Sequence, residues 1–127
     1  MAKRDLTGAV DFAHLQHYAG GDQALVEEVL SLFREQVKLW VRLLDPAAGD
    51  DAWRDAAHSL KGSALGVGAF GLAAACELAE LADDPGRRGV ALNGVRDALD
   101  AALADISAYE HELALQSLRT PKPGDRA

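Results

Sequence analysis

His58 is the residue of this sequence best placed to do chemistry, because it projects toward water from a predicted helix. If the surrounding residues form a helix whose core face centres on Leu60, a rotation of about 100° per residue puts His58 about 160° from that face. Lys61 and Gly62 follow within about one turn. A neutral imidazole is nucleophilic near its ordinary pKa of about 6.5, and a lysine supplies positive charge. This combination is suited to carrying a phosphoryl group.

Gly62 is unusual for the middle of a helix, where glycine costs roughly 1 kcal/mol relative to alanine. We favour access as the reason, since the missing side chain leaves the imidazole of His58 open to another protein. Without Lys61 and Gly62, an ordinary surface histidine would be the better interpretation. For Lys61 alone, a solvated surface lysine explains the residue as well as a phosphate contact does.

The elements before His58 are predicted to be one short helix and one long helix. Asp11 and Asp22 are plausible N-caps, and Gly20-Gly21 separates the two helices. The long helix ends near Asp45-Pro46 and carries two apolar stripes. The first stripe comprises Val26, Leu30, Phe33, Val37, Trp40 and Leu44, and the second comprises Leu25, Val29, Leu32, Leu39 and Leu43. A helix with two apolar stripes must pack against several neighbours or leave part of its apolar surface exposed for a partner, and we expect packing.

Three further helices are predicted from the position of His58 onward. The helix that carries His58 is expected to end at Gly66 and Gly68, and the next to close at 83–86. There Asp84 is the expected cap of the last helix, with Pro85 in its first turn. The expected inward positions of the three helices are Trp53, Ala56, Leu60, Ala64 and Val67; Leu72, Cys76 and Ala79; and Leu92, Val95, Leu99, Ala102, Ile106, Tyr109 and Leu113.

These segments together predict an all-α fold, an antiparallel up-down four-helix bundle with a short extra N-terminal helix. We assign residues 1–118 to the bundle. The polar, proline-containing segment 119–127 has nothing to bury, and we expect a disordered C-terminal tail there.

The composition excludes several function classes. A single domain is expected for 127 residues, and a net charge of −7 without a cluster of Lys and Arg argues against nucleic acid and acidic membranes. No secretory signal is evident, and the weakly polar run 64–76 is too short to span a bilayer. Cys76 is the only cysteine, which fits a reducing compartment, and we expect a buried, unreactive side chain. A cytoplasmic protein is therefore expected.

The run Ala57-His58-Ser59-Leu60-Lys61-Gly62-Ser63-Ala64, followed by Gly68-Ala69, resembles the signature of histidine-containing phosphotransfer (HPt) domains, His-x-Leu-Lys-Gly with a second glycine ten residues after the histidine. The resemblance covers roughly Val10 to Asp83. It implies that His58 is phosphorylated on Nε2, that Lys61 lies near the phosphoryl group and that Gly62 leaves room for a receiver domain. Family members often carry Gln or Glu at the position of Glu80, where the side chain helps to orient the imidazole. Leu65 departs from the small or polar residue expected at its place.

The function implied is that of a phosphorelay carrier, with His58 taking a phosphoryl group from the aspartate of one receiver domain and passing it to the aspartate of another. The implied partners are response-regulator receiver domains and a hybrid or other sensor histidine kinase. No cofactor of its own is expected, because the partner's receiver would supply Mg²⁺. Gly66-Val67-Gly68 ends a helix and does not follow a strand, so we expect no ATP site and no kinase activity. A monomer is expected to dock one receiver at a time through the His58 face, with Leu32 and Val37 as candidate contacts.

Two alternatives stay open at this point. The chain could be the phosphoacceptor fragment of a chemotaxis-type histidine kinase, or a non-phosphorylated helical adaptor. His14 and His17 share a helical face with Asp11, but no fourth metal ligand is evident, and we interpret them as exposed helix residues. His111 has no companion, so no metal site is expected.

Overall fold

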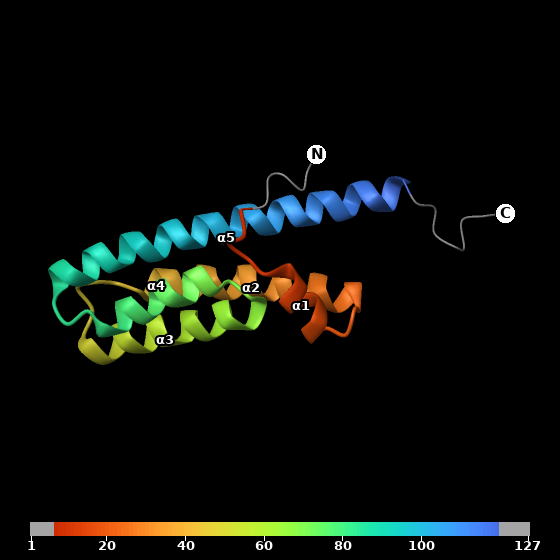
Figure 1. Ribbon diagram of the computed structural model, residues 1–127. Helices are drawn as coiled ribbons and strands as arrows, with labels where there is room; N and C mark the ends of the chain where they lie inside the picture. Colours follow the sequence, from red (N-terminus) through yellow and green to blue (C-terminus); the bar gives the residue numbers. More distant parts are fainter. Residues whose placement is uncertain (1–6, 120–127) are drawn as a thin grey trace.

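The computed structural model describes residues 7–119, and all regular structure in that part of the chain is helical (Figure 1). Its elements are α1 (Phe12–Tyr18), α2 (Gln23–Leu43), α3 (Asp50–Val67), α4 (Phe70–Leu81) and α5 (Pro85–Arg119). Helix α3 packs against α2 and α4, and α4 packs against α5, so that α2 to α5 form the predicted four-helix bundle. The short α1 covers one end, beside α2 and α3.

The three predicted aspartate caps, at the starts of α1, α2 and α5, are confirmed. The Oδ1 atom of Asp11 accepts a hydrogen bond from the His14 amide at 3.0 Å, and that of Asp22 accepts one from the Leu25 amide at 3.2 Å. Asp84 does the same for the Arg87 amide at 2.8 Å, with Pro85 as the first residue of α5. These bonds satisfy amides that have no partner inside the helix.

Gly68 ends α3, whereas Gly66 lies inside the helix, so only one of the two predicted terminators is correct. Gly68 has a left-handed φ of +81°, which L side chains rarely adopt. Its carbonyl accepts a 2.9 Å hydrogen bond from the Asp11 amide. A Cβ atom at Gly68 would lie 2.8 Å from the Asp11 carbonyl oxygen. Glycine is therefore needed here both for the backbone conformation and for the close approach of α1.

The first apolar stripe of α2 faces the core, with Val26, Leu30, Phe33 and Val37 buried. The expectation that the second stripe would also be packed was wrong for its four leucines, whereas Val29 is partly buried and packs against the core. Leu25, Leu32, Leu39 and Leu43 are between 39% and 56% exposed. The physical reason is that α2 packs chiefly against α3, so the neighbouring helices cover only one side of it.

A polar cluster locks the start of α3 against the end of α4. The indole Nε1 of Trp53 donates to the Ala79 carbonyl at 2.7 Å. The buried Arg88 guanidinium lies 5.5 Å from the Trp53 ring, donates from Nε to the Ala82 carbonyl at 3.0 Å and contacts Asp50 at 2.8 Å. Because α4 terminal carbonyls accept these bonds, the cluster fixes the alignment of α3 with α4. That alignment places His58 opposite Glu80.

A buried carboxylate on α5 attaches the segment before α1. Asp105 is fully buried, and its oxygens accept hydrogen bonds from the amides of Thr7 and Ala9, both at 2.8 Å. The Thr7 hydroxyl donates a third at 3.0 Å. Several donors around one carboxylate offset the cost of burying its charge.

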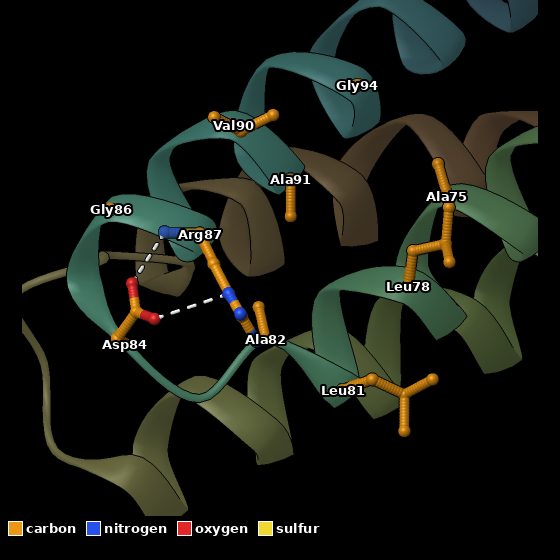
Figure 2. A pocket seen from close by; sticks show the side chains of 10 residues that line it. All are labelled: Ala75, Leu78, Leu81, Ala82, Asp84, Gly86, Arg87, Val90, Ala91 and Gly94. Atoms are coloured by element: carbon orange, nitrogen blue, oxygen red, sulfur yellow. Dashed lines mark hydrogen bonds and ion pairs between the residues drawn. The ribbon is translucent and has the colours of Figure 1, made fainter.

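A hollow of about 860 Å³ lies between α4 and α5, and Figure 2 shows the side chains that line it. Leu78, Leu81 and Val90 project beside it and are exposed. Its charged members, Asp84 and Arg87, pair with each other.

Two further sequence predictions concern a membrane span and the C-terminal tail. In the described part of the chain, no helix is long and apolar enough to cross a membrane. The predicted tail at 119–127 lies outside the described residues, except that Arg119 ends α5.

Candidate functional site

His58 lies in the middle of α3 and points away from the core, as the sequence predicted. Its side chain is 74% exposed. The buried face of α3 consists of other residues, including Trp53, Leu60 and Ala64. The imidazole is therefore available to another molecule without any rearrangement of the bundle.

Glu80 on α4 holds one of the two ring nitrogens of His58. Its Oε1 atom lies 3.2 Å from Nδ1 of the imidazole. A carboxylate accepts hydrogen bonds, so this contact favours the tautomer with the proton on Nδ1 and the lone pair on Nε2. In that tautomer Nε2 carries the free lone pair of an exposed ring.

Lys61 completes the group. Its Nζ atom lies 3.6 Å from the same Oε1 atom of Glu80, and the side chains of Lys61 and Glu80 are each 24% exposed. The separation is an ion-pair distance rather than a tight hydrogen bond. The ammonium is thus held beside the carboxylate that contacts the imidazole.

Gly62 opens the surface next to His58. A Cβ atom built at Gly62 would meet nothing within 4 Å. Beside it lies a hollow of about 540 Å³ between α1, α2 and α3, whose rim includes Tyr18, Leu32 and Leu65. All three of these side chains are exposed. The space next to the imidazole is therefore free and has an apolar border.

Comparison with known proteins gives the family. Residues 23–109 match the Hpt domain family. The chain belongs to this family. The Hpt chain is also similar to the crystal structure of the histidine phosphotransferase ShpA from Caulobacter crescentus, at 55% sequence identity and a TM-score of 0.74. The alignment covers 87% of this chain and 99% of that one. A search of curated proteins found no match.

The α2 surface of this Hpt domain requires one correction. Leu32 is exposed at the rim of the hollow, but Val37 is only 1% exposed, so Val37 cannot be a docking contact. Val37 belongs to the stripe of α2 that faces the core, and Leu32 belongs to the exposed stripe. Both side chains are apolar, and only the arrangement of neighbouring helices distinguishes them.

Gln36 and Ser63 form a link beside Gly62 that the sequence analysis missed. The Ser63 Oγ atom lies 3.2 Å from Gln36 Oε1 and 3.2 Å from the Ser59 carbonyl oxygen. The hydroxyl has a single proton and can donate to only one of them. The link joins α2 to α3 next to the hollow. The signal in the sequence that could have revealed this link is Gln36, a polar residue between Leu32 and Leu39 of the second apolar stripe.

Cys76 lies beneath the site and is buried, as predicted. Burial, together with the negative charge of Glu80, raises the pKa of its thiol to about 12, although the positive charge of Lys61 acts in the opposite direction. Cys76 is therefore a protonated thiol at neutral pH and takes no part as a nucleophile.

None of the other histidines takes part in the contact between His58 and Glu80, although His14 lines the hollow beside Gly62. His14 packs edge-on against Phe70 with ring centroids 5.3 Å apart, and His17 and His111 are exposed. Among residues 7–119, no three His, Cys, Asp or Glu side chains are grouped in a way that could hold a metal ion.

Proposed function

We propose that this Hpt protein is a phosphorelay carrier in which His58 accepts a phosphoryl group from the aspartate of one receiver domain and passes it to the aspartate of another. The observation that carries the proposal is the exposed imidazole of His58 with Nδ1 against Glu80, which leaves Nε2 directed at a partner. The 55% identity to a protein named as a histidine phosphotransferase supports it.

In the forward step the lone pair on Nε2 of His58 attacks the phosphorus of the partner's aspartyl phosphate. The bond between phosphorus and the carboxylate oxygen breaks, and the aspartate leaves with that electron pair. The ring, still carrying its Nδ1 proton, becomes positively charged, and the carboxylate of Glu80 beside Nδ1 stabilises it. Transfer to the second receiver reverses these bond changes, so no proton has to be exchanged with solvent.

Lys61 neutralises charge on the phosphoryl oxygens in this proposal. An ammonium that pairs with Glu80 at 3.6 Å in the free protein can turn to the phosphoryl group when that group arrives. Phosphoryl transfer depends mainly on positioning and on neutralising the charge of the transferred group. The Mg²⁺ and the acidic pocket of a receiver would supply the rest, so the carrier needs no cofactor and no ATP.

The receiver is proposed to dock over Gly62 and the adjoining hollow. Tyr18, Leu32 and Leu65 would be buried against it, since exposed aromatic and aliphatic side chains around an open centre are typical of an interface. One such surface on a monomer admits one receiver at a time. A cytoplasmic location and a sensor histidine kinase upstream are part of the same proposal.

Incubation of the protein with a phosphorylated receiver domain tests the proposal. We expect an acid-labile, alkali-stable phosphate on the wild-type chain and none on His58→Gln, whose melting temperature should be unchanged because the side chain holds no core contact. Absence of transfer from every receiver of the source organism would favour the helical adaptor. Efficient phosphorylation by an ATP-bound kinase core alone would favour the chemotaxis-type module.

A further inference from the structure

The seam between α2 and α5 gathers positive charge in an acidic protein. Two adjoining hollows of about 430 and 380 Å³ lie along it and share Lys38, Val41 and Arg42. Arg34 lines the first and Arg96 the second, so four of the chain's 13 Lys and Arg residues border one seam. Asp45 is the only acidic residue among those that line the two hollows. The local charge is thus opposite to the net charge of −7.

At one end of the seam the chain itself neutralises a cation. Arg34 on α2 pairs with both carboxylate oxygens of Glu110 on α5. Further along, α5 presents Leu103, Leu99 and then Arg96 to the hollows. No carboxylate of the described residues lies within 4.0 Å of the guanidinium groups of Arg42 or Arg96. Two cations therefore border the second hollow without an ion-pair partner from the part of the chain that the structure describes.

Neither Lys38 nor Arg42 is explained fully by its own helix. Lys38 pairs with Glu35 at 3.5 Å, but both side chains are well exposed, and such pairs contribute little. Arg42 lies in the last turn of α2, where a cation is favourable. The favourable position at the end of the helix accounts for the positive charge of Arg42. It does not account for the placement of Arg96 on the other side of the seam.

We propose that this seam is a second docking surface, which binds an acidic amphipathic helix of a protein partner. Val41, Leu99 and Leu103 give the first hollow an apolar floor, and Val41 with Leu92 does the same for the second, so a small anion would leave most of the seam unused. Lys38 and Arg42 are spaced four residues apart, which is about 6 Å along a helix axis. Carboxylates at the same spacing on a partner helix can meet both cations while its apolar face covers the floor.

The seam is separate from the phosphotransfer site. Arg34, Lys38 and Arg42 lie on the opposite side of α2 from Leu32 and Gln36, which border the hollow beside Gly62. Helix α5 packs against α4, and α3, which carries His58, packs against α2 and α4. A partner in the seam would therefore leave His58 accessible to a receiver.

A designed helical peptide with leucines on one face and glutamates four residues apart is the probe, titrated into the ¹⁵N-labelled full chain. We expect chemical-shift changes along α2 and α5 at the seam and weaker binding at high salt. Lys38→Glu combined with Arg42→Glu should weaken binding by about tenfold or more, because opposed charges become like charges. Arg54→Glu combined with Arg87→Glu is the matched control, since these exposed arginines lie outside the seam and change the net charge equally.

Several outcomes would overturn the proposal. Equal loss of binding in both double variants would mean that only net charge matters. Shift changes confined to the hollow between α4 and α5, or to the His58 face, would place the peptide elsewhere. A probe with lysines in place of the glutamates that binds as well would refute the charge argument. Binding of anionic lipid vesicles but not of the acidic peptide would assign the cations to a membrane surface instead.

Discussion

Replacing Gly68 with alanine should destabilise the bundle, although the same change two residues earlier should stabilise it. Alanine at Gly68 must adopt a φ of +81°, which costs an L residue roughly 1–2 kcal/mol. Its Cβ atom would lie 2.8 Å from the Asp11 carbonyl oxygen, so the backbone of α1 must shift. That shift weakens the hydrogen bond from the Asp11 amide to Gly68, worth about 1 kcal/mol. The expected loss is about 2–3 kcal/mol of unfolding free energy.

Urea and thermal unfolding measure this loss, with Gly66→Ala as the matched control. Gly66 is helical and a Cβ there meets nothing within 4 Å, so alanine should gain about 0.5–1 kcal/mol. At roughly 4 °C per kcal/mol for a domain of this size, Gly68→Ala should melt about 8–12 °C lower than the parent. His58 lies about three turns earlier in α3, so phosphotransfer well below the melting temperature should persist. A Gly68→Ala protein that melts at the parental temperature would refute the account of this glycine.

Three further predictions concern the site and the residue beneath it. Gly62→Ala should raise stability by about 0.5–1 kcal/mol, whereas Gly62→Gln should fold but slow single-turnover transfer steeply, because its side chain enters the open space beside His58; a Gln variant that transfers at the parental rate would disprove the access argument. Glu80→Ala should slow transfer to His58, while Glu80→Gln should retain more of the rate because its amide oxygen can still accept from Nδ1; rapid-quench kinetics on the pair would contradict this if neither variant differed from the parent. Cys76 should resist a thiol reagent at pH 8 in the folded protein and react after unfolding, because its pKa is raised to about 12. As the pH rises, the thiol ionises first in the unfolded chain. The contribution of the buried Cys76 to the free energy of unfolding is therefore complete below about pH 9 and is lost as the pH rises toward 12, a pH dependence that Cys76→Ala should lack. Rapid labelling of the native protein would be inconsistent with this burial.

Local signals in the sequence were sufficient to predict the starts of α1, α2 and α5 and the outward direction of His58. Asp11, Asp22 and Asp84 cap the helices that follow them, because capping involves only residues three positions apart. The outward direction of His58 follows from helix geometry alone. Its contact with Glu80 was anticipated from the family resemblance, since the two residues lie on different helices.

Features that depend on neighbouring helices could not be read from the chain. Val37 and Leu32 are both apolar residues of α2, and only the one-sided packing of that helix decides that one is buried and the other exposed. Gly68 rather than Gly66 ends α3, where α1 approaches the backbone. The buried Asp105 meets donors on Thr7 and Ala9, almost the whole length of the bundle sequence away.

Glu80 is proposed to hold Nδ1 of His58 so that Nε2 takes the phosphoryl group. NMR of the phosphorylated ¹⁵N-labelled protein, recorded with long-range proton-to-nitrogen correlation of the four histidine rings, shows which ring nitrogen bears the phosphate. We predict that His58 alone changes to a phosphoramidate, with phosphorus bonded to Nε2 and the proton retained on Nδ1. Phosphate on Nδ1 of His58, or on His14, His17 or His111, would contradict the account.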